Sequence, residues 1–203
     1  MIVAVVLAAG TSSRMGKPKQ TLVLEGEPML ERVLRTLRQT KVDVTVVVLG
    51  AGAEEVRKKV RWGDEKLVVN HDYSNGMSES LKIGLKSVQE VADAALIVLA
   101  DQPFVSSETV DRVIDAYLKS KVAVVAPSYK GTRGNPVLFD KRLFPRIMGI
   151  KGDVGAKSVV EENRKDMLVV EVDDEGILQD IDTPADYERG SSKSKSRRTR
   201  GAS

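Results

Sequence analysis

The stretch IVAVVL at Ile2–Leu7 is a short, continuous apolar run, rich in β-branched residues, and it ends in Ala8–Gly10. Two later stretches have the same character, VTVVVL at Val44–Leu49 and AALIVL at Ala94–Leu99. Apolar runs of this length without alternation are typical of strands that are buried on both faces of a parallel sheet. The three runs therefore predict the centre of a sheet that helices cover on both sides.

Segments with a helical period lie between these strands, and four weaker strand patterns continue the alternation. We expect helices over Met29–Leu37, Ser78–Val91, Ser107–Leu118 and Val154–Glu162, and further strands over Leu67–Asn70, Val122–Ala126, Pro136–Phe139 and Leu168–Val172. Strands and helices that alternate from the first residue predict a Rossmann-like α/β fold of three layers with a mostly parallel central sheet. Ligands of such folds bind beyond the carboxyl ends of the strands, so the residues that follow each strand are the site candidates.

Length and composition narrow the class of protein. The 203 residues suffice for one domain with a substantial core. The absence of cysteine excludes disulfides and cysteine-based zinc sites, and it favours the cytoplasm. No apolar run approaches the ~20 residues of a membrane helix, and no charged segment precedes the first strand as it would in a signal peptide.

The net charge of +3 is unevenly distributed, because residues 190–203 (GSSKSKSRRTRGAS) contain five Lys or Arg and no acid. Without them the chain has 27 basic and 29 acidic side chains, a net charge near −2. A Ser-, Gly- and Lys/Arg-rich segment without an apolar face predicts disorder. We therefore expect one domain at 1–189 and a basic tail at 190–203, which is either a solvated end or an arm that binds nucleic acid.

The loop after the first strand reads GTSSRMGKPK. Gly10 and Gly16 let the backbone approach a ligand closely, and Thr11 offers a hydroxyl and an N–H group. Arg14 and Lys19 supply positive charge, so the loop suits a triphosphate. It is not a P-loop, because five residues instead of four separate its glycines, and the G-x-G-x-x-G fingerprint of dinucleotide sites is absent.

The segment NHDYSNGMSESLKIGL begins at Asn70, which ends an expected strand. Gly76 and Ser78 stand at the start of the next expected helix, and Ser78 and Ser80 either cap this helix or present hydroxyls to a ligand. His71 is the only histidine, which excludes a histidine-based metal site, and we assign it a structural or peripheral role.

Two aspartates are candidates for a metal site. Asp101 directly follows the buried run Ala94–Leu99, and Mg²⁺ is ordinarily held by one or two carboxylates together with substrate phosphates. An Asp two residues before Pro103 is also an ordinary turn residue. Asp182 precedes Thr183-Pro184, a pattern typical of a helix N-cap and first turn, and is expected at the mouth of a loop.

LAAGTSSRMGKPKQ resembles the signature loop of the MobA-like nucleotidyltransferases, L-A-[AG]-G-x-x-x-R-M-G-x-x-K, with the spacing intact from Leu7 to Lys19. The resemblance implies a GT-A-like fold and makes Lys19, at the α-phosphate, and Arg14, at the outer phosphates, the catalytic residues. The string D-x-D-T-P-x-D-Y near the end of the chain resembles a motif of many nucleotidyltransferases with this fold. This resemblance implies that Asp182, rather than Asp180, holds the metal together with Asp101. The nucleotide-binding residues implied are Leu7, Ala8, Ala9, Gly10, Thr11, Arg14, Lys19, Asn70, Gly76, Ser78, Ser80 and Asp101.

Several details resemble the cytidylyltransferase branch of this family. These are Ala9 in Leu-Ala-Ala-Gly, the Ala100–Pro103 sequence Ala-Asp-Gln-Pro, and the N-x-x-x-x-x-G-M-x-x-S-L pattern that starts at Asn70. RGNPVLF and GDVGAK could be ordinary turns, but they resemble the acceptor half of the molybdenum cofactor cytidylyltransferases. The acceptor-binding residues implied are Arg133, Gly134, Asn135, Pro136, Gly152, Asp153 and Gly155.

The resemblance thus implies a cytoplasmic, Mg²⁺-dependent enzyme that transfers CMP from CTP to the phosphate of molybdopterin or molybdenum cofactor and releases pyrophosphate. A molybdoenzyme or its chaperone is the protein partner that fits this role. The alternatives are the GTP-dependent guanylyltransferase of the same family and a sugar-phosphate nucleotidyltransferase. The slightly acidic body and few aromatic residues disfavour a nucleic-acid-binding protein. The intact pairs Arg14/Lys19 and Asp101/Asp182 disfavour a carrier that binds the pterin cofactor without chemistry.

Overall fold

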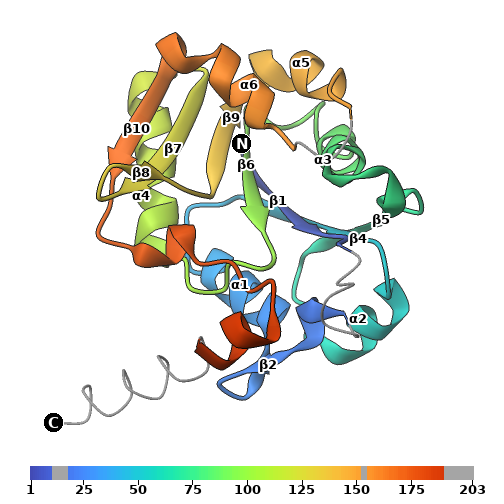
Figure 1. Ribbon diagram of the computed structural model, residues 1–203. Helices are drawn as coiled ribbons and strands as arrows, with labels where there is room; N and C mark the ends of the chain where they lie inside the picture. The colour runs from blue at the N-terminus through green and yellow to red at the C-terminus, as the bar shows by residue number, and fades with distance from the viewer. Residues whose placement is uncertain (11–17, 152–154, 190–203) are drawn as a thin grey trace, which may run out of the picture.

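The computed structural model describes residues 1–10, 18–151 and 155–189, and a mostly parallel sheet forms its centre (Figure 1). The sheet has eight strands in the order β10-β7-β9-β6-β1-β4-β5, with β8 paired to β7 beside this path. Along the path β9 is antiparallel to both of its neighbours, and every other adjacent pair is parallel. The strands are β1 (Ile2–Ala8), β4 (Val44–Leu49), β5 (Lys66–Val69), β6 (Ala94–Leu99), β7 (Val124–Tyr129), β8 (Thr132–Arg133), β9 (Val137–Asp140) and β10 (Met167–Glu171).

Helices cover both faces of the sheet, as the apolar runs predict. Alternate β1 side chains such as Val6 face α1 (Met29–Leu37), α2 (Ala53–Lys59) and α4 (Ser107–Ser120). The intervening ones, such as Val5, face α3 (Met77–Lys86), α5 (Phe144–Met148) and α6 (Lys157–Glu162). The predicted three-layer α/β class is therefore confirmed.

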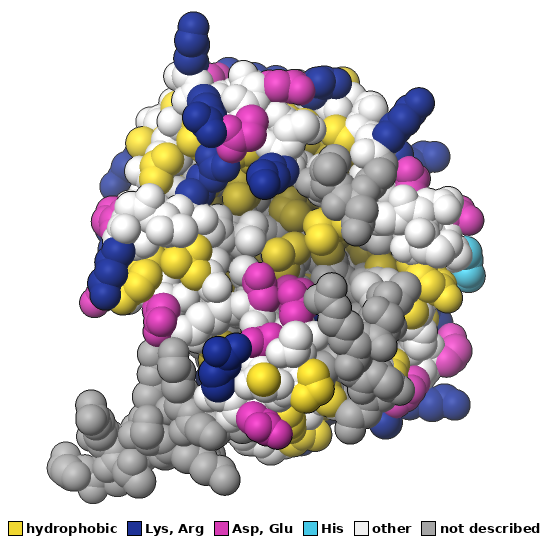
Figure 2. All heavy atoms as spheres, in the orientation of Figure 1, with side chains coloured by type: hydrophobic (Ala, Val, Ile, Leu, Met, Phe, Trp, Pro, Cys, Tyr) yellow, Lys and Arg dark blue, Asp and Glu magenta, His cyan; other side chains and the backbone are white. Residues whose placement is uncertain are grey.

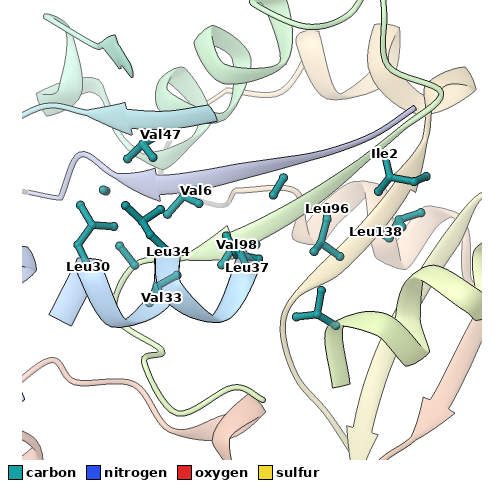
Figure 3. Packing of buried hydrophobic residues seen from close by; sticks show 14 of the residues in the cluster. Ile2, Val6, Leu30, Val33, Leu34, Leu37, Val47, Leu96, Val98 and Leu138 are labelled. Atoms are coloured by element: carbon teal, nitrogen blue, oxygen red, sulfur yellow. The ribbon is translucent and has the colours of Figure 1, made fainter. Parts of the chain in front are cut away.

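In helix α1 the apolar residues that recur with a helical period are the ones that pack against the sheet. Its apolar positions Leu30, Val33, Leu34 and Leu37 lie on one stripe, and Figure 3 shows this stripe against side chains from three adjacent strands, Val6, Val47 and Val98. Each of these α1 residues is at most 4% exposed. Complete burial of one such side chain contributes about 1.5–3 kcal/mol before entropy is counted.

Some boundaries differ from the prediction for local reasons. Helix α4 begins at Ser107, as predicted, after the cap residue Ser106, whose Oγ accepts a hydrogen bond from the Thr109 backbone N–H at 3.1 Å, but it ends at Ser120 instead of Leu118. Helix α3 ends at Lys86 instead of Val91, because the chain continues in turns in which the Val88 N–H bonds the Leu85 carbonyl at 3.0 Å.

The short elements were not predicted. Helix α2 carries Val56 as its one buried residue and therefore has no apolar stripe, and α5 has only five residues. The hairpin of β2 (Val23–Leu24) and β3 (Glu27–Pro28) is too short for any period to appear. Five 3₁₀ turns complete this part of the chain: η1 (Lys19–Thr21), η2 (Tyr73–Asn75), η3 (Lys141–Leu143), η4 (Arg164–Asp166) and η5 (Glu175–Leu178).

The topology fixes where a ligand can bind. From β1 the chain moves outward to β4 and β5 on one side and then returns to place β6 on the other side of β1. The carboxyl ends of β1 and β6 thus border a switch point, the position at which open α/β sheets form a crevice. None of the helices in the described part of the chain has the length and hydrophobicity needed to cross a membrane.

Candidate active site

A pocket of about 480 Å³ opens at the carboxyl ends of β1 and β6. Figure 2 shows this face hollowed at its centre, with hydrophobic and acidic side chains along the hollow. Five segments that are distant in sequence contribute to its wall. Their described lining residues are Leu7, Ala9, Gly10, Lys19, Gln20, Tyr73, Ser74, Gly76, Met77, Ser80, Leu99, Ala100, Asp101, Asp180 and Asp182.

Lys19 connects two carboxylates at the wall of this pocket. Its Nζ donates to Asp101 Oδ2 at 2.6 Å and to Asp182 Oδ1 at 2.7 Å. The Lys19 and Asp101 side chains are 15% and 21% exposed, whereas Asp182 is 47% exposed. The structure therefore brings together Lys19, Asp101 and Asp182, the described residues that the sequence assigns to catalysis or to the metal.

Two hydrogen bonds to backbone carbonyls hold the segments of Lys19 and Asp182 in place. The buried Gln20 side chain donates from Nε2 to the Ala8 carbonyl at 2.7 Å, which ties η1 to the end of β1. The Ile181 N–H donates to the Asp101 carbonyl at 2.9 Å, which ties the C-terminal segment to the turn after β6. Lys19 and Asp182 are thus each adjacent in sequence to an anchored residue.

The charges of the site influence one another. Burial lowers the pKa of the Lys19 ammonium, but the contacts with Asp101 and Asp182 outweigh burial and hold this pKa above its ordinary value. Asp180 follows a different balance. The loss of solvent around its carboxyl group raises its pKa, a hydrogen bond from Gln102 Nε2 at 2.6 Å lowers it, and the negative charges of Asp101 and Asp182 raise it further. The net effect is a raised pKa for both the Lys19 ammonium and the Asp180 carboxyl group.

The donor set fits a hard divalent cation. Asp101 Oδ2 and Asp182 Oδ1 already contact one cationic group, and the buried Asp101 Oδ1 has no hydrogen-bond partner among the residues that the structure describes. No group of three or more His, Cys, Asp or Glu side chains in that part of the chain is arranged around a common point. Two carboxylates that leave room for phosphates and water are what Mg²⁺ or Mn²⁺ requires.

The segment after β5 differs from the prediction in detail. Asn70 is fully buried below the pocket, where its Nδ2 donates to Ser80 Oγ at 3.0 Å and its Oδ1 accepts from the Asp72 N–H at 2.9 Å. Ser80 lines the pocket, whereas Ser78 is fully buried. Helix α3 begins after Gly76 without a side-chain cap, so the capping role considered for the two serines is wrong.

The sequence profile of the MobA-like NTP transferase domain matches residues 4–167. The chain belongs to this family. Purine catabolism protein PucB of Bacillus subtilis is 32% identical over 199 residues, covering 92% of this chain and 94% of that protein. Nicotine blue oxidoreductase of Paenarthrobacter nicotinovorans is 30% identical over 189 residues, covering 90% and 92%.

Solved structures agree with this assignment. The crystal structure of Rv0371c from Mycobacterium tuberculosis is 31% identical, covers 94% of this chain and 97% of its own, and superposes with a TM-score of 0.86. A manganese complex of the same mycobacterial protein superposes with a TM-score of 0.81 at 29% identity, covering 94% and 98%. The chain is therefore a nucleotidyltransferase of the MobA-like family, and the predicted family is confirmed.

In this MobA-like transferase, the first predicted acceptor segment packs against α6 and η5 and is not among the residues that line the pocket. Arg133 is paired with Glu161 of α6, with 2.6 Å between Nη2 and Oε1. The Asn135 N–H donates to the Ile177 carbonyl at 3.2 Å, and a Cβ on Gly134 would lie 2.4 Å from the same oxygen. The buried Pro136 follows.

The second predicted acceptor segment reaches the pocket at one described position. A Cβ on Gly155, which has a φ of +54°, would lie 3.0 Å from Sδ of the pocket residue Met77. Four other predicted site residues lie outside the described residues, namely Thr11, Arg14, Gly152 and Asp153.

Sequence reasoning missed several residues of the wall. Gln20 directly follows Lys19, and its amide was indistinguishable from an ordinary loop side chain. Tyr73 and Met77 stand inside the stretch that was predicted to bind the base, but neither offers the short polar group that pairs with the edge of a base. An aromatic residue in an otherwise polar loop was the available signal for Tyr73.

Proposed function

We propose that this MobA-like transferase moves a cytidylyl group from CTP to the phosphate of a molybdopterin-type acceptor and releases pyrophosphate. The observation that carries the proposal is the contact of the Lys19 ammonium with both Asp101 and Asp182 at the wall of the pocket. A cation and two carboxylates on one wall of a pocket can neutralise a triphosphate and hold a divalent cation on it at the same place.

The acceptor phosphate is already an anion, so the protein needs no nucleophile of its own. An acceptor oxygen attacks the α-phosphorus of the nucleotide, the bond from that phosphorus to the bridging oxygen breaks, and pyrophosphate leaves with the bonding electrons. Lys19 stabilises the charge that develops on the transferred group, and Arg14 is proposed to hold the leaving pyrophosphate.

Asp101 and Asp182 are the residues that would hold the divalent cation, which we take to be Mg²⁺. When bound, this cation neutralises phosphate charge and helps to orient the two reacting groups. The manganese complex of Rv0371c, a relative that matches nearly the whole chain, supports a divalent cation.

The choice of CTP rests on sequence details of the nucleotide half. Ala9 in Leu-Ala-Ala-Gly and Gln102 in Ala-Asp-Gln-Pro resemble the cytidylyltransferase branch, whereas GTP would place the chain in the guanylyltransferase branch. The names of the two relatives, a purine catabolism protein and an oxidoreductase, point to different chemistry, so the residues of this chain alone support the choice of CTP.

The acceptor is proposed to contact the two glycine-containing segments of the second half, Arg133–Pro136 and Gly152–Gly155. The neighbourhood of Gly155 and Met77 supports this placement, because Met77 belongs to the pocket wall. A cytoplasmic molybdoenzyme or its chaperone is the proposed recipient of the product.

Pyrophosphate release tests the proposal. The full chain is assayed with Mg²⁺ and molybdopterin cofactor, and with CTP, GTP, ATP or UTP, beside an Asp101→Asn variant as the inactive control. We expect release with CTP that requires the acceptor and is lost in the variant. Release with GTP alone would reject cytidylyl transfer in favour of guanylyl transfer, and release with a sugar phosphate instead of the pterin would reject the acceptor.

A further inference from the structure

The short turn η2 places an aromatic side chain on the wall of the nucleotide pocket. The chain has one Trp, four Tyr and three Phe, all within the described residues, and Tyr73 is the one among them that lines this pocket. Tyr73 is 37% exposed, although large apolar side chains in this chain are mostly buried. An exposed aromatic ring inside a cleft is available to a ligand.

Hydrogen bonds to the buried Asn70 fix the position of this turn. The Asn75 N–H donates to the Asp72 carbonyl at 2.9 Å, and the Asp72 N–H donates to Oδ1 of the buried Asn70 at 2.9 Å. Asn70 in turn donates to Ser80 Oγ on α3. Asn70 therefore serves as the support of η2, and Tyr73 is carried by a turn that is anchored in the core.

A glycine allows Tyr73 to approach the end of β1. A Cβ added to Gly50 would lie 2.7 Å from Ala9 Cβ and 2.8 Å from Tyr73 Cβ, distances that real Cβ atoms do not adopt. Since Gly50 has no side chain, Tyr73 packs beside Ala9, at the point where the phosphate loop begins. Tyr73, Ala9 and Gly10 thus border the same pocket.

The lining of the pocket combines two chemistries. Lys19 and Asp101 supply charge for phosphates and a cation, while Tyr73 and Met77, which is 41% exposed, supply apolar surface. A nucleoside triphosphate carries both counterparts, a polyanion and a flat nucleobase. Every base has a π-face, so stacking on an aromatic side chain strengthens binding without strong choice between bases.

We propose that Tyr73 is a nucleotide-positioning residue on which the nucleoside part of the NTP stacks, and that its ring and not its hydroxyl makes the contribution. This inference rests on the proposed nucleotidyl transfer at the same pocket. Tyr73 and the neighbouring polar groups then have different roles. Tyr73 contributes affinity for any nucleoside, whereas hydrogen-bonding groups such as Ser80 determine which base is bound.

Calorimetric titration of the full chain with Mg²⁺ and CTP, GTP or inorganic tripolyphosphate separates the nucleoside from the phosphates. The variants are Tyr73→Leu, which keeps apolar volume, and Tyr73→Phe, which keeps the ring. We expect Tyr73→Leu to weaken binding of CTP and GTP by about tenfold each. Tripolyphosphate binding should stay within about twofold, and Tyr73→Phe should behave like the wild type. Thermal unfolding of each variant verifies its fold.

The outcomes distinguish this inference from the proposed function. Equal weakening of CTP and tripolyphosphate, no weakening by Tyr73→Leu, or a loss in Tyr73→Phe as large as in Tyr73→Leu would overturn the stacking role and leave nucleotidyl transfer standing. A selective loss of CTP and GTP binding in Tyr73→Leu, in a protein that transfers no nucleotide, would support the stacking role while the proposed function fails.

Discussion

Replacement of Lys19 by Met is the most direct perturbation of the site, because it removes one charge and keeps the length of the side chain. Two unit charges about 4 Å apart interact by ~4 kcal/mol at an effective dielectric constant of ~20, and Lys19 Nζ lies 2.6 Å and 2.7 Å from its carboxylate oxygens. Loss of a comparable contact in a transition state costs about 2.7–4 kcal/mol. We therefore expect Lys19→Met to lower the turnover number for pyrophosphate release by about 10²–10³-fold.

The same variant has a second consequence for the metal site. In the wild type, the ammonium competes with a divalent cation for Asp101 Oδ2 and Asp182 Oδ1. Without nucleotide, Lys19→Met should therefore bind Mn²⁺ more tightly than the wild type, which the free Mn²⁺ signal in electron paramagnetic resonance measures. Metal-free stability should fall by only about 1–2 kcal/mol, because Asp182 is half exposed and solvent screens its charge.

Lys59→Met is the matched control. Lys59 forms an exposed ion pair with Glu55 at 2.7 Å on α2 and does not line the pocket that contains Asp101 and Asp182. This variant should keep wild-type turnover and Mn²⁺ affinity. Wild-type turnover in Lys19→Met, or Mn²⁺ binding weaker than in the wild type, would refute the reasoning that one ammonium serves the phosphates and masks the metal ligands.

Three further predictions concern the scaffold and the tail. Gly84→Ala should lower the free energy of unfolding in urea by about 1–3 kcal/mol, because the new Cβ would lie 2.4 Å from Val5 Cγ1, and unchanged stability would contradict this packing. Ser106→Ala should cost about 1 kcal/mol by the same measurement, since it removes the cap on the Thr109 N–H of α4. Deletion of residues 190–203 should leave pyrophosphate release unchanged, and a loss of turnover would show that the basic tail belongs to the active protein.

The sheet was predictable because its central strands have a strong local signature. β1, β4 and β6 were expected within one residue of their observed bounds, since a parallel strand buried on both faces must be apolar throughout. Helices α1 and α4 were predictable from a different signature, because each buries one apolar stripe with a helical period. Helix α2 has a single buried residue, Val56, so it lacks the apolar stripe on which the helix predictions depended.

The residues of the site could be predicted to lie together only from the resemblance to a known family, because they are far apart in the sequence. Lys19 stands 82 positions from Asp101 and 163 positions from Asp182, and no local pattern relates such residues. The rule that ligands bind at the carboxyl ends of strands selects Asp101 after β6, but Asp182 follows no strand directly. The position of Asp182 depends on the hydrogen bond from the Ile181 N–H to the Asp101 carbonyl, which forms only in the folded chain.

The first proposed acceptor segment, Arg133–Pro136, also has a structural role. Gly134 is required by packing alone, since a Cβ there would lie 2.4 Å from the Ile177 carbonyl of η5. That carbonyl accepts from the Asn135 N–H, and Ile181, four residues further along, is bonded to Asp101. A change at Gly134 would therefore displace the segment that carries Asp182, and weaker binding of the acceptor would be accompanied by weaker binding of the metal and nucleotide. Substitutions at Arg133, whose partner is Glu161 on α6, avoid this coupling and separate the two roles.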